Sequence, residues 1–127
     1  MSAMRTIPIE SLRGNPAELR TIASVLEDGG LVCMPHNAGY RLMVDATNEE
    51  AVTRLLQAKR RTKHAPSLLF IGSAKQVHQV ASNFGPEGVR LAERFWPGPL
   101  TVLVEPSEDL PRRVVKQLAK ANKHLGV

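Results

Sequence analysis

Signals that begin helices alternate with short apolar runs along this chain, and that alternation limits the folds open to it. Three polar clusters have the pattern of a helix N-terminus, with a capping residue followed three positions later by Glu or Gln: residues 15–18, 47–50 and 73–76. Three apolar runs have the length and composition of buried strands: residues 31–34, 67–71 and 100–104. Helices interleaved with buried strands are typical of an α/β sheet, and we predict that fold class.

The predicted helices carry apolar residues at helical spacing, and we expect these residues to face a core. They are Leu19, Ile22, Ala23 and Leu26; Val52, Leu55 and Leu56; Val77, Val80, Ala81 and Phe84; and Val89, Ala92 and Phe95. Gly29-Gly30 is expected to end the first helix, and Gly85-Pro86 to begin a short one. Pro97-Gly98-Pro99 forces a turn, beside which Trp96 is expected to pack in the core.

The remaining segments give further expectations. Thr6–Ile9 is expected to be an edge strand, because Pro8 fits a sheet only there. Residues 35–45 are expected to be irregular, a last helix to begin near Asp109, and a strand to begin at Leu125. We find no repeat or linker and predict one domain over residues 1–127.

Composition limits the class of protein. Apolar residues make up 43% of 127 residues, which is typical of a globular domain. The net charge of +5 favours polyanionic partners such as RNA, nucleotide or an acidic surface, although ordinary solubility also accounts for it. Aromatic residues are only 4%, which argues against a base-stacking platform. No apolar run approaches membrane-spanning length and no signal-peptide core is present, so we predict a cytoplasmic protein without a membrane partner.

Cys33 is the single cysteine, so it cannot form an internal disulfide. We expect it to be a core residue of a strand, because a catalytic thiolate needs an accessible, electropositive site. No residue is assigned as catalytic, and no metal site is predicted.

A basic run, Lys59-Arg60-Arg61-Thr62-Lys63-His64, follows the second predicted helix. No acidic residue occurs from Leu55 to His64, so the run can meet an anion. A solvated helix end is the alternative, because the dipole of a helix C-terminus also accepts cations. A second basic stripe, Arg112, Lys116, Lys120 and Lys123, recurs at helical spacing near the end of the chain.

These motifs together resemble the YrdC-like family, whose active members are threonylcarbamoyl-AMP synthases. The resemblance rests on residues 29–35, Tyr40, residues 45–52, the pair Lys59-x-Arg61, Pro66 and residues 95–101, in that order. It implies a twisted mixed sheet with flanking helices and a concave, positively charged surface. It also implies synthesis of threonylcarbamoyl-adenylate from threonine, bicarbonate and ATP carried with Mg²⁺, a product used to modify adenosine 37 of tRNA.

The resemblance assigns roles to individual residues. Lys59 and Arg61 would neutralise the ATP phosphates and the carboxylated intermediate, and Tyr40 would lie in the substrate loop with Asn37 and Arg41. Double-stranded RNA binding is also ascribed to the family. Because phosphates are neutralised by cations, the candidate RNA contacts are the basic residues of both runs: Lys59, Arg60, Arg61, Lys63, Arg112, Lys116 and Lys120.

The chain departs from the family pattern where the substrate loop is expected. The family sequence Pro-Thr-Asp-Thr-x-Tyr-Gly-Leu is replaced by Pro35-His36-Asn37-Ala38-Gly39-Tyr40-Arg41-Leu42. Both hydroxyls and the carboxylate are lost, and a long cation replaces a glycine at Arg41. Thr62 and Ala65 replace a proline and a lysine of the family, and the later Ser-x-Asn motif has no counterpart.

Three readings follow. The first is a diverged, inactive member that keeps affinity for RNA, tRNA or nucleotide. The second is a working synthase whose remaining residues lie outside this sequence. The third is a domain of a larger maturation enzyme that acts on another carbamoyl-adenylate. An unpaired sheet edge would favour pairing with another copy of the chain, so a homo-oligomer is also expected.

Overall fold

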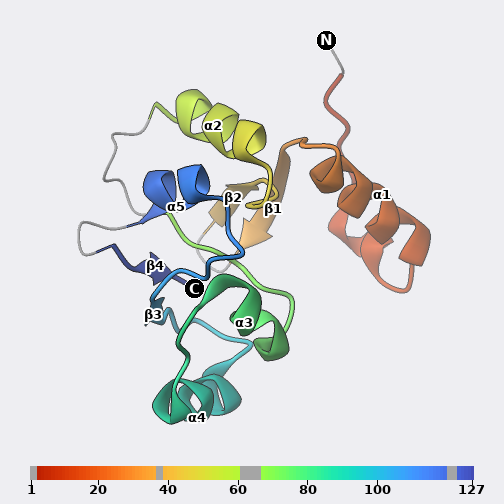
Figure 1. Ribbon diagram of the computed structural model, residues 1–127. Coiled ribbons are helices and arrows are strands. Elements are labelled where there is room, and N and C mark those ends of the chain that lie inside the picture. Colours follow the sequence, from red (N-terminus) through yellow and green to blue (C-terminus); the bar gives the residue numbers. More distant parts are fainter. Residues whose placement is uncertain (1–2, 37–38, 61–66, 120–122) are drawn as a thin grey trace. The chain divides into compact units, whose positions relative to one another are not determined.

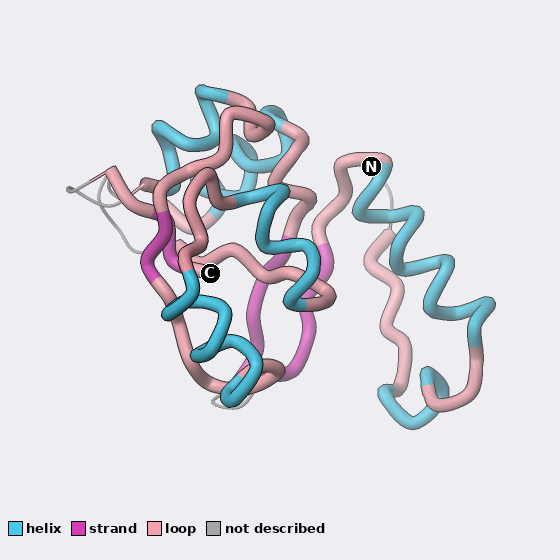
Figure 2. Tube along the Cα trace, turned by 60° about the horizontal axis from the view of Figure 1, so that its bottom comes forward, coloured by secondary structure: helices cyan, strands magenta, loops and turns pink. Residues whose placement is uncertain are grey.

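The computed structural model describes residues 3–36, 39–60, 67–119 and 123–127. The chain divides into two compact units, Met1–Asp45 and Ala46–Val127, and each is described by itself. The prediction of a single domain therefore stays a prediction. Figure 1 labels the elements of both units, and Figure 2 shows the same trace with helices and strands in different colours.

The first unit contains a helical segment followed by a hairpin. Its elements are the 3₁₀ helix η1 Ile9–Leu12, the helix α1 Pro16–Glu27, and the strands β1 Val32–His36 and β2 Gly39–Met43. The predicted edge strand Thr6–Ile9 is wrong. Pro8 instead precedes η1, and its carbonyl accepts from the Ser11 amide at 3.0 Å.

Helix α1 begins and ends where the sequence indicates. Asn15 Oδ1 accepts the Glu18 amide at 3.3 Å, and Pro16 is the first helical residue. The Glu18 carboxylate does not make the reciprocal contact of a capping box, in which it would accept the Asn15 amide, because it pairs with Arg5 at 2.8 Å and the Asn15 amide donates to the Leu12 carbonyl. None of the residues of α1 is buried, so its predicted apolar face is at most half-covered.

A Schellman turn ends α1. Gly29 has φ +80° and donates to the Leu26 carbonyl at 2.9 Å, and Gly30 donates to the Val25 carbonyl at 2.7 Å. A Cβ on Gly30 would lie 2.7 Å from that Val25 oxygen, so both glycines of the predicted stop are needed.

The segment predicted to be irregular at 35–45 is mostly strand. β1 and β2 pair antiparallel, with Met34 opposite Arg41, Pro35 opposite Tyr40 and His36 opposite Gly39. A two-stranded sheet consists of edge strands, which tolerate Pro35. Cys33 lies opposite Leu42 and is exposed, so its predicted burial is wrong, because the hairpin leaves the side chain of Cys33 open to solvent.

The second unit alternates helices with short strands. Its elements are α2 Glu49–Ala58, η2 Ala74–Gln76, α3 Val77–Val80, α4 Pro86–Phe95, β3 Leu103–Val104, α5 Arg112–Leu118 and β4 Leu125–Gly126. β4 pairs antiparallel with β3, and Gly126 forms a parallel bridge with Leu68. β4 therefore has an antiparallel neighbour, β3, and a parallel neighbour at Leu68. The predicted α/β class with mixed pairing is confirmed.

Of the three predicted buried strands, the run 31–34 forms a strand but is exposed at Leu31, Cys33 and Met34, and the other two are shorter than expected. The run 67–71 contributes a single bridge at Leu68, and the run 100–104 is a regular strand only at Leu103–Val104. Val102 still exchanges two backbone hydrogen bonds with Val127, at 2.9 and 3.0 Å, so the pairing extends beyond the regular strand. The predicted strand at Leu125 is confirmed.

Caps fix the helices of the second unit. The cap of α2 is Asn48, whose Oδ1 accepts the Ala51 amide at 3.0 Å, so this helix begins one residue later than predicted from Thr47. Gln76 Oε1 accepts the Ser73 amide at 3.3 Å, as its predicted capping box requires. The last helix begins at Arg112 rather than near Asp109, because the Asp109 amide donates to Ser107 Oγ at 3.2 Å in a turn.

The core of the second unit is built from small and branched side chains. The buried apolar residues are Ala51, Val52, Leu69, Val77, Ala81, Ala92, Val104, Leu110, Val114, Leu118, Leu125 and Val127. Trp96 is half-buried; its indole donates to the Leu100 carbonyl at 2.8 Å and its ring stacks on Phe84, with centroids 5.9 Å apart. Phe95 is exposed, contrary to the prediction, because it follows Ala92 on the edge of the buried face of α4.

Arg60 has an unusual backbone conformation for an arginine. It follows Lys59, the C-cap of α2, and has φ +50°. Its amide donates to the Gln57 carbonyl at 3.1 Å, as the residue after a helix cap commonly does when it is glycine. An L-residue in this conformation costs roughly 1 kcal/mol or more.

We expect truncation of Leu125 to destabilise the second unit far more than truncation of Leu103. Leu125 is 1% exposed and Leu103 is 47% exposed, although both lie in the same pair of strands. Leu125→Ala should lower the free energy of unfolding by about 2–5 kcal/mol, and Leu103→Ala by less than about 1 kcal/mol. Urea denaturation followed by circular dichroism measures both, and equal losses would contradict the assigned core.

We expect glycine to be favoured over alanine at position 60 and disfavoured at position 57. Arg60→Gly should be more stable than Arg60→Ala by about 1 kcal/mol, because only glycine adopts φ +50° without strain. In the last turn of α2 the order should reverse, with Gln57→Gly less stable than Gln57→Ala by about 1 kcal/mol. The same preference at both positions, in thermal unfolding, would refute the left-handed assignment.

Candidate phosphate-binding surface

Positive charge is concentrated in the second unit. Residues 46–127 contain 13 of the 17 Lys and Arg residues and 7 of the 12 Asp and Glu residues, a formal excess of six positive charges. Residues 1–45 contain the remaining four cations and five anions. A polyanion is therefore attracted to the second unit.

The acidic residues of the second unit are unevenly distributed along the sequence. No Asp or Glu occurs between residues 51 and 86, or after Asp109. Most of α2 and all of α5 are therefore free of carboxylates. The acidic residues of α2 are confined to its first turn, at Glu49 and Glu50, where the helix dipole favours them.

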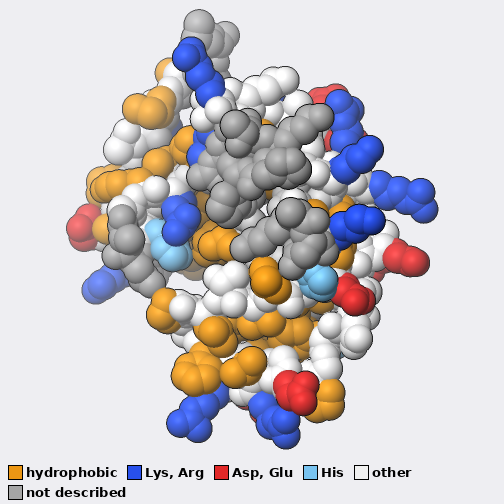
Figure 3. All heavy atoms as spheres, turned by 90° about the vertical axis from the view of Figure 1, so that its left-hand side faces the viewer, with side chains coloured by type: hydrophobic (Ala, Val, Ile, Leu, Met, Phe, Trp, Pro, Cys, Tyr) orange, Lys and Arg blue, Asp and Glu red, His pale blue; other side chains and the backbone are white. Residues whose placement is uncertain are grey.

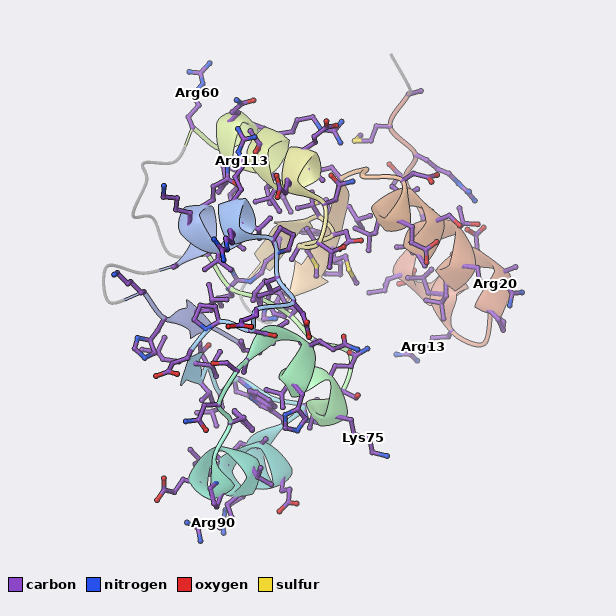
Figure 4. All side chains as sticks on the ribbon, viewed as in Figure 1. Arg13, Arg20, Arg60, Lys75, Arg90 and Arg113 are labelled. Atoms are coloured by element: carbon purple, nitrogen blue, oxygen red, sulfur yellow. The ribbon has the colours of Figure 1, made fainter. Side chains whose placement is uncertain are left out.

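The first basic run begins at the C-terminal end of α2. Lys59 and Arg60 are both exposed, and Arg60 has a left-handed backbone conformation. Figure 4 shows the Arg60 side chain projecting outward from this end. Arg61 and Lys63, predicted as contacts in the same run, lie outside the described residues.

The second basic run begins at α5. Arg112, Arg113 and Lys116 are exposed on this helix, whereas Val114 and Leu118 are buried, so α5 has one basic, solvated face and one buried face. Lys120 lies outside the described residues. Lys123, which follows them, has φ +65°, a second cationic residue in the left-handed region.

Helices α2 and α5 pack against each other. Gln117 Nε2 donates to Thr53 Oγ1 at 3.0 Å, and Thr53 Oγ1 donates to the Glu49 carbonyl at 2.9 Å. Val52 and Val114 are the largest fully buried side chains of the two helices. Lys59 and Arg60 at the end of α2, and Arg112, Arg113 and Lys116 on α5, are therefore the described cations of two packed helices, which we call the basic helix pair. In Figure 3, Lys and Arg side chains gather at the level of α2 and α5, with apolar side chains below them.

The residues predicted from the substrate loop lie in the other unit. Tyr40 is 78% exposed and Arg41 is also exposed, on consecutive positions of β2. Consecutive strand residues point to opposite faces, so these two side chains do not share a face of the hairpin. Asn37 lies outside the described residues. The resemblance implies a concave, positively charged surface, and the placement of Tyr40, Lys59 and Arg61 on it stays a prediction.

Sequence reasoning missed two features of the second unit. Arg113 adds a cation to α5 that the selected helical spacing left out. A cavity of about 480 Å³ lies at the start of the same helix, lined by Pro106, Ser107, Glu108, Leu110, Arg112 and Val115. Arg113 was recognisable as the neighbour of Arg112, but the cavity depends on the turn before α5 and had no sequence signal.

The described residues also limit other kinds of site. Among them, no group of three or more His, Cys, Asp and Glu side chains is arranged to hold a metal ion. None of the helices in the described part of the chain is long and apolar enough to cross a membrane.

Curated proteins of known function resemble this sequence. A threonylcarbamoyl-AMP synthase of Pyrococcus abyssi is 38% identical over 95 residues, which cover 75% of this chain and 28% of that protein. The synthase of Halorhodospira halophila is 31% identical over 99 residues, 78% of this chain and 52% of that protein. The chain thus spans between about a quarter and a half of the length of these relatives.

Solved structures share the fold. The structure of Pyrococcus abyssi Sua5 in complex with L-threonine matches with a TM-score of 0.78 and 34% identity, over 89% of this chain and 32% of that one. The solution structure of MTH1692 from Methanobacterium thermoautotrophicum matches with a TM-score of 0.66 and 29% identity, over 99% of this chain and 55% of that one. Full-length HypF with bound phosphate and nucleotide matches at 24% identity and a TM-score of 0.65, which shows the fold alone.

The family model of the Sua5, YciO and YrdC proteins, described as "Telomere recombination", matches residues 24–127. This span includes the basic helix pair and the hairpin, and it confirms the resemblance seen in the motifs. The chain therefore belongs to the Sua5/YciO/YrdC family.

Proposed function

We propose that this chain is a diverged YrdC-like module that binds the phosphates of RNA or nucleotide on its basic helix pair, with little synthase activity of its own. The observation that carries the proposal is the packing of α5 on α2, joined by the Gln117–Thr53 hydrogen bond at 3.0 Å. The packing brings together two helices whose basic runs are more than 50 residues apart in sequence. Helix α2 has no Asp or Glu after Glu50, and α5 has none.

Helix stability alone does not account for these cations. Lys59 and Arg60 follow the C-terminus of α2, where the dipole favours positive charge. Arg112 and Arg113, however, occupy the first turn of α5, where the dipole disfavours it. Arg60 also occupies a backbone conformation that favours glycine. Cations kept at unfavourable positions support a role in binding an anion.

The chemistry of the surface favours phosphate without base recognition. Tyr, Phe and Trp together make up only 4% of the sequence, so bases have few rings on which to stack. Binding through Lys and Arg alone is largely independent of sequence and weakens steeply with salt, because each neutralised phosphate releases counterions. Structured RNA, including tRNA, is the polyanion that this family context favours.

We expect the basic residues of the two runs to set RNA affinity. Lys59→Ala, Arg61→Ala and Lys63→Ala in one variant should weaken binding of a structured RNA about tenfold or more at low salt and reduce the salt slope by about 2–3. A second variant, Arg112→Ala with Lys116→Ala and Lys120→Ala, tests α5 separately. Fluorescence anisotropy with tRNA across a salt series measures both.

A charge-matched control separates a site from general attraction. Arg13→Ala, Arg20→Ala and Lys75→Ala remove three exposed cations outside the basic helix pair, and this variant should bind nearly as the parent does. Equal weakening by all three variants would assign binding to net charge. No measurable affinity of the parent chain at low salt would overturn the proposal.

An active threonylcarbamoyl-AMP synthase is the second candidate. The 38% identity to the Pyrococcus abyssi enzyme favours it. In this reading Lys59 and Arg61 hold the phosphates of Mg²⁺-bound ATP, and Tyr40 with Asn37 and Arg41 orients the second substrate. Cations suit this chemistry, because adenylyl transfer depends on positioning and charge stabilisation. A carbamoyl-adenylate domain of a larger maturation enzyme is a third reading with the same phosphate site.

We expect this chain alone to release little pyrophosphate from ATP in the presence of threonine and bicarbonate. The loop hydroxyls and carboxylate of the family are replaced at His36, Asn37 and Ala38, and loss of one positioned polar group typically costs a hundredfold or more in rate. A coupled pyrophosphate assay measures turnover, with an intact family enzyme as positive control. Threonine-dependent turnover comparable to that enzyme would establish the second candidate instead.

A further inference from the structure

Gln117 of α5 has one of its two amide atoms unpaired. Its Nε2 donates to Thr53 Oγ1 of α2 at 3.0 Å. Within the described part of the chain, its Oε1 accepts no hydrogen bond although it is buried. A buried acceptor without a donor lowers stability, because it has given up its hydrogen bonds to water. This polar contact is therefore poorly suited to join the two helices for stability alone.

Thr53 fixes which atom of the amide faces it. The Thr53 hydroxyl donates its single proton to the Glu49 carbonyl at 2.9 Å, so toward Gln117 it is an acceptor. An amide turned the other way round would place Oε1 against that hydroxyl oxygen and lose the bond. Oε1 is therefore held in the unpaired position for as long as the two helices pack in this way.

The apolar residues of α5 do not by themselves determine how the helix is turned. Val114 and Val115 are consecutive, and a helix turns by about 100° per residue, so either one can face the core together with Leu118. In the structure Val114 is buried and Val115 is half-buried. Val115 also lines the cavity of about 480 Å³ at the start of α5, so close packing does not hold the helix on that side. Because apolar contact is not directional, a directional contact is needed to select one rotation.

A turn of α5 would redirect its cations. Arg113 lies four residues before Gln117, on the same face of the helix, and Lys116 is one turn after Arg113. Figure 4 shows Arg113 at the same end of the unit as Arg60 of the first basic run. The contact that turns Gln117 toward Thr53 therefore also sets the direction of the basic side chains of α5.

We propose that Gln117 is a positioning residue of the basic helix pair, whose bond to Thr53 fixes the rotation of α5 and the direction of Arg113 and Lys116 at a cost in stability. A single buried polar residue has this role in coiled coils, where it specifies register although it lowers stability. The effect on RNA affinity rests on the proposed function, whereas the rotation is testable without RNA.

Thiol labelling tests the rotation of α5. In a Cys33→Ser background, Val114→Cys should react with a thiol reagent about tenfold or more slowly than Val115→Cys, because position 114 is 0% exposed. Adding Thr53→Val together with Gln117→Leu should shrink this difference, since neither rotation is then selected. An unchanged difference overturns the proposal, whether or not the chain binds RNA.

Stability and RNA affinity should change in opposite directions in the variant Thr53→Val with Gln117→Leu. Its melting temperature should equal or exceed that of the parent, because the buried amide and its partner are removed together. Its affinity for tRNA at low salt should fall about threefold or more and its salt slope by about 1, because fewer cations of α5 reach phosphates at once. Thermal unfolding and fluorescence anisotropy across a salt series measure these changes.

A purely structural role for Gln117 gives a different result. Unfolding lowers the fraction of protein that binds RNA but does not change the salt slope of the protein that remains folded. Loss of both stability and affinity at an unchanged salt slope would therefore overturn the proposal.

Two matched variants serve as controls. Thr53→Ser keeps the hydroxyl and should behave as the parent does in every measurement. Gln79→Leu makes the same change as Gln117→Leu at an exposed residue of α3, outside the basic helix pair, and should leave affinity and salt slope nearly unchanged. An equal loss of affinity in Gln79→Leu would assign the effect to added apolar surface and overturn the proposal. If the parent binds no RNA, the proposed function fails, and the labelling result alone upholds or overturns the role of Gln117.

Discussion

Pairing of the segment 125–127 with two other segments holds the second unit together. Gly126 and Leu125 lie beside β3 on one edge and the Leu68 region on the other, and Val127 exchanges hydrogen bonds with Val102. Leu125 also supplies one of the three largest fully buried side chains, with Val52 and Val114. These side chains come from β4, α2 and α5, so the core of the second unit includes the strand at the end of the chain and both helices at which the basic runs begin.

The basic helix pair combines two sequence patterns, each of which alone is weak evidence for a binding surface. A run of cations after a helix is commonly a solvated end, and a basic amphipathic helix is commonly a solvated face. Their packing against each other, through Thr53 and Gln117, brings positive charge from both runs to one unit, and the carboxylates of α2 are confined to its first turn. Long-range attraction of a polyanion depends on that sum rather than on any single residue.

Local signals in the sequence predicted the elements better than their burial. Asn15, Ser73, Gly29 and Pro86 act within one helical turn, and each marks a helix end in the structure close to where it was expected. Burial depends on neighbours distant in sequence. Cys33 and Phe95 were therefore expected inside, whereas the hairpin and the rim of α4 expose them.

The candidate site was recognisable from the sequence only in its residue types, because its geometry depends on neighbours distant in sequence. The family motif Lys59-x-Arg61 identified the cation at Lys59, and the helical spacing of basic residues identified Arg112, because residue type and order are visible in a sequence. The contact between α2 and α5, the cavity before α5 and the left-handed backbone of Arg60 depend on tertiary packing. The placement of Tyr40 and Arg41 on opposite strand faces depends on the hairpin, which the sequence analysis did not predict because it expected residues 35–45 to be irregular.

The backbone pairing of Val127 has a practical consequence for handling the protein. Val127 is buried and is bonded through both its amide and its carbonyl to Val102. Antiparallel pairing in this register directs any residues joined to Val127 along the segment that precedes Val102, beside Thr101 and Leu100. An affinity tag fused directly there would compete with or extend the sheet, whereas a tag joined before the exposed residues 3–6 would leave that pairing undisturbed.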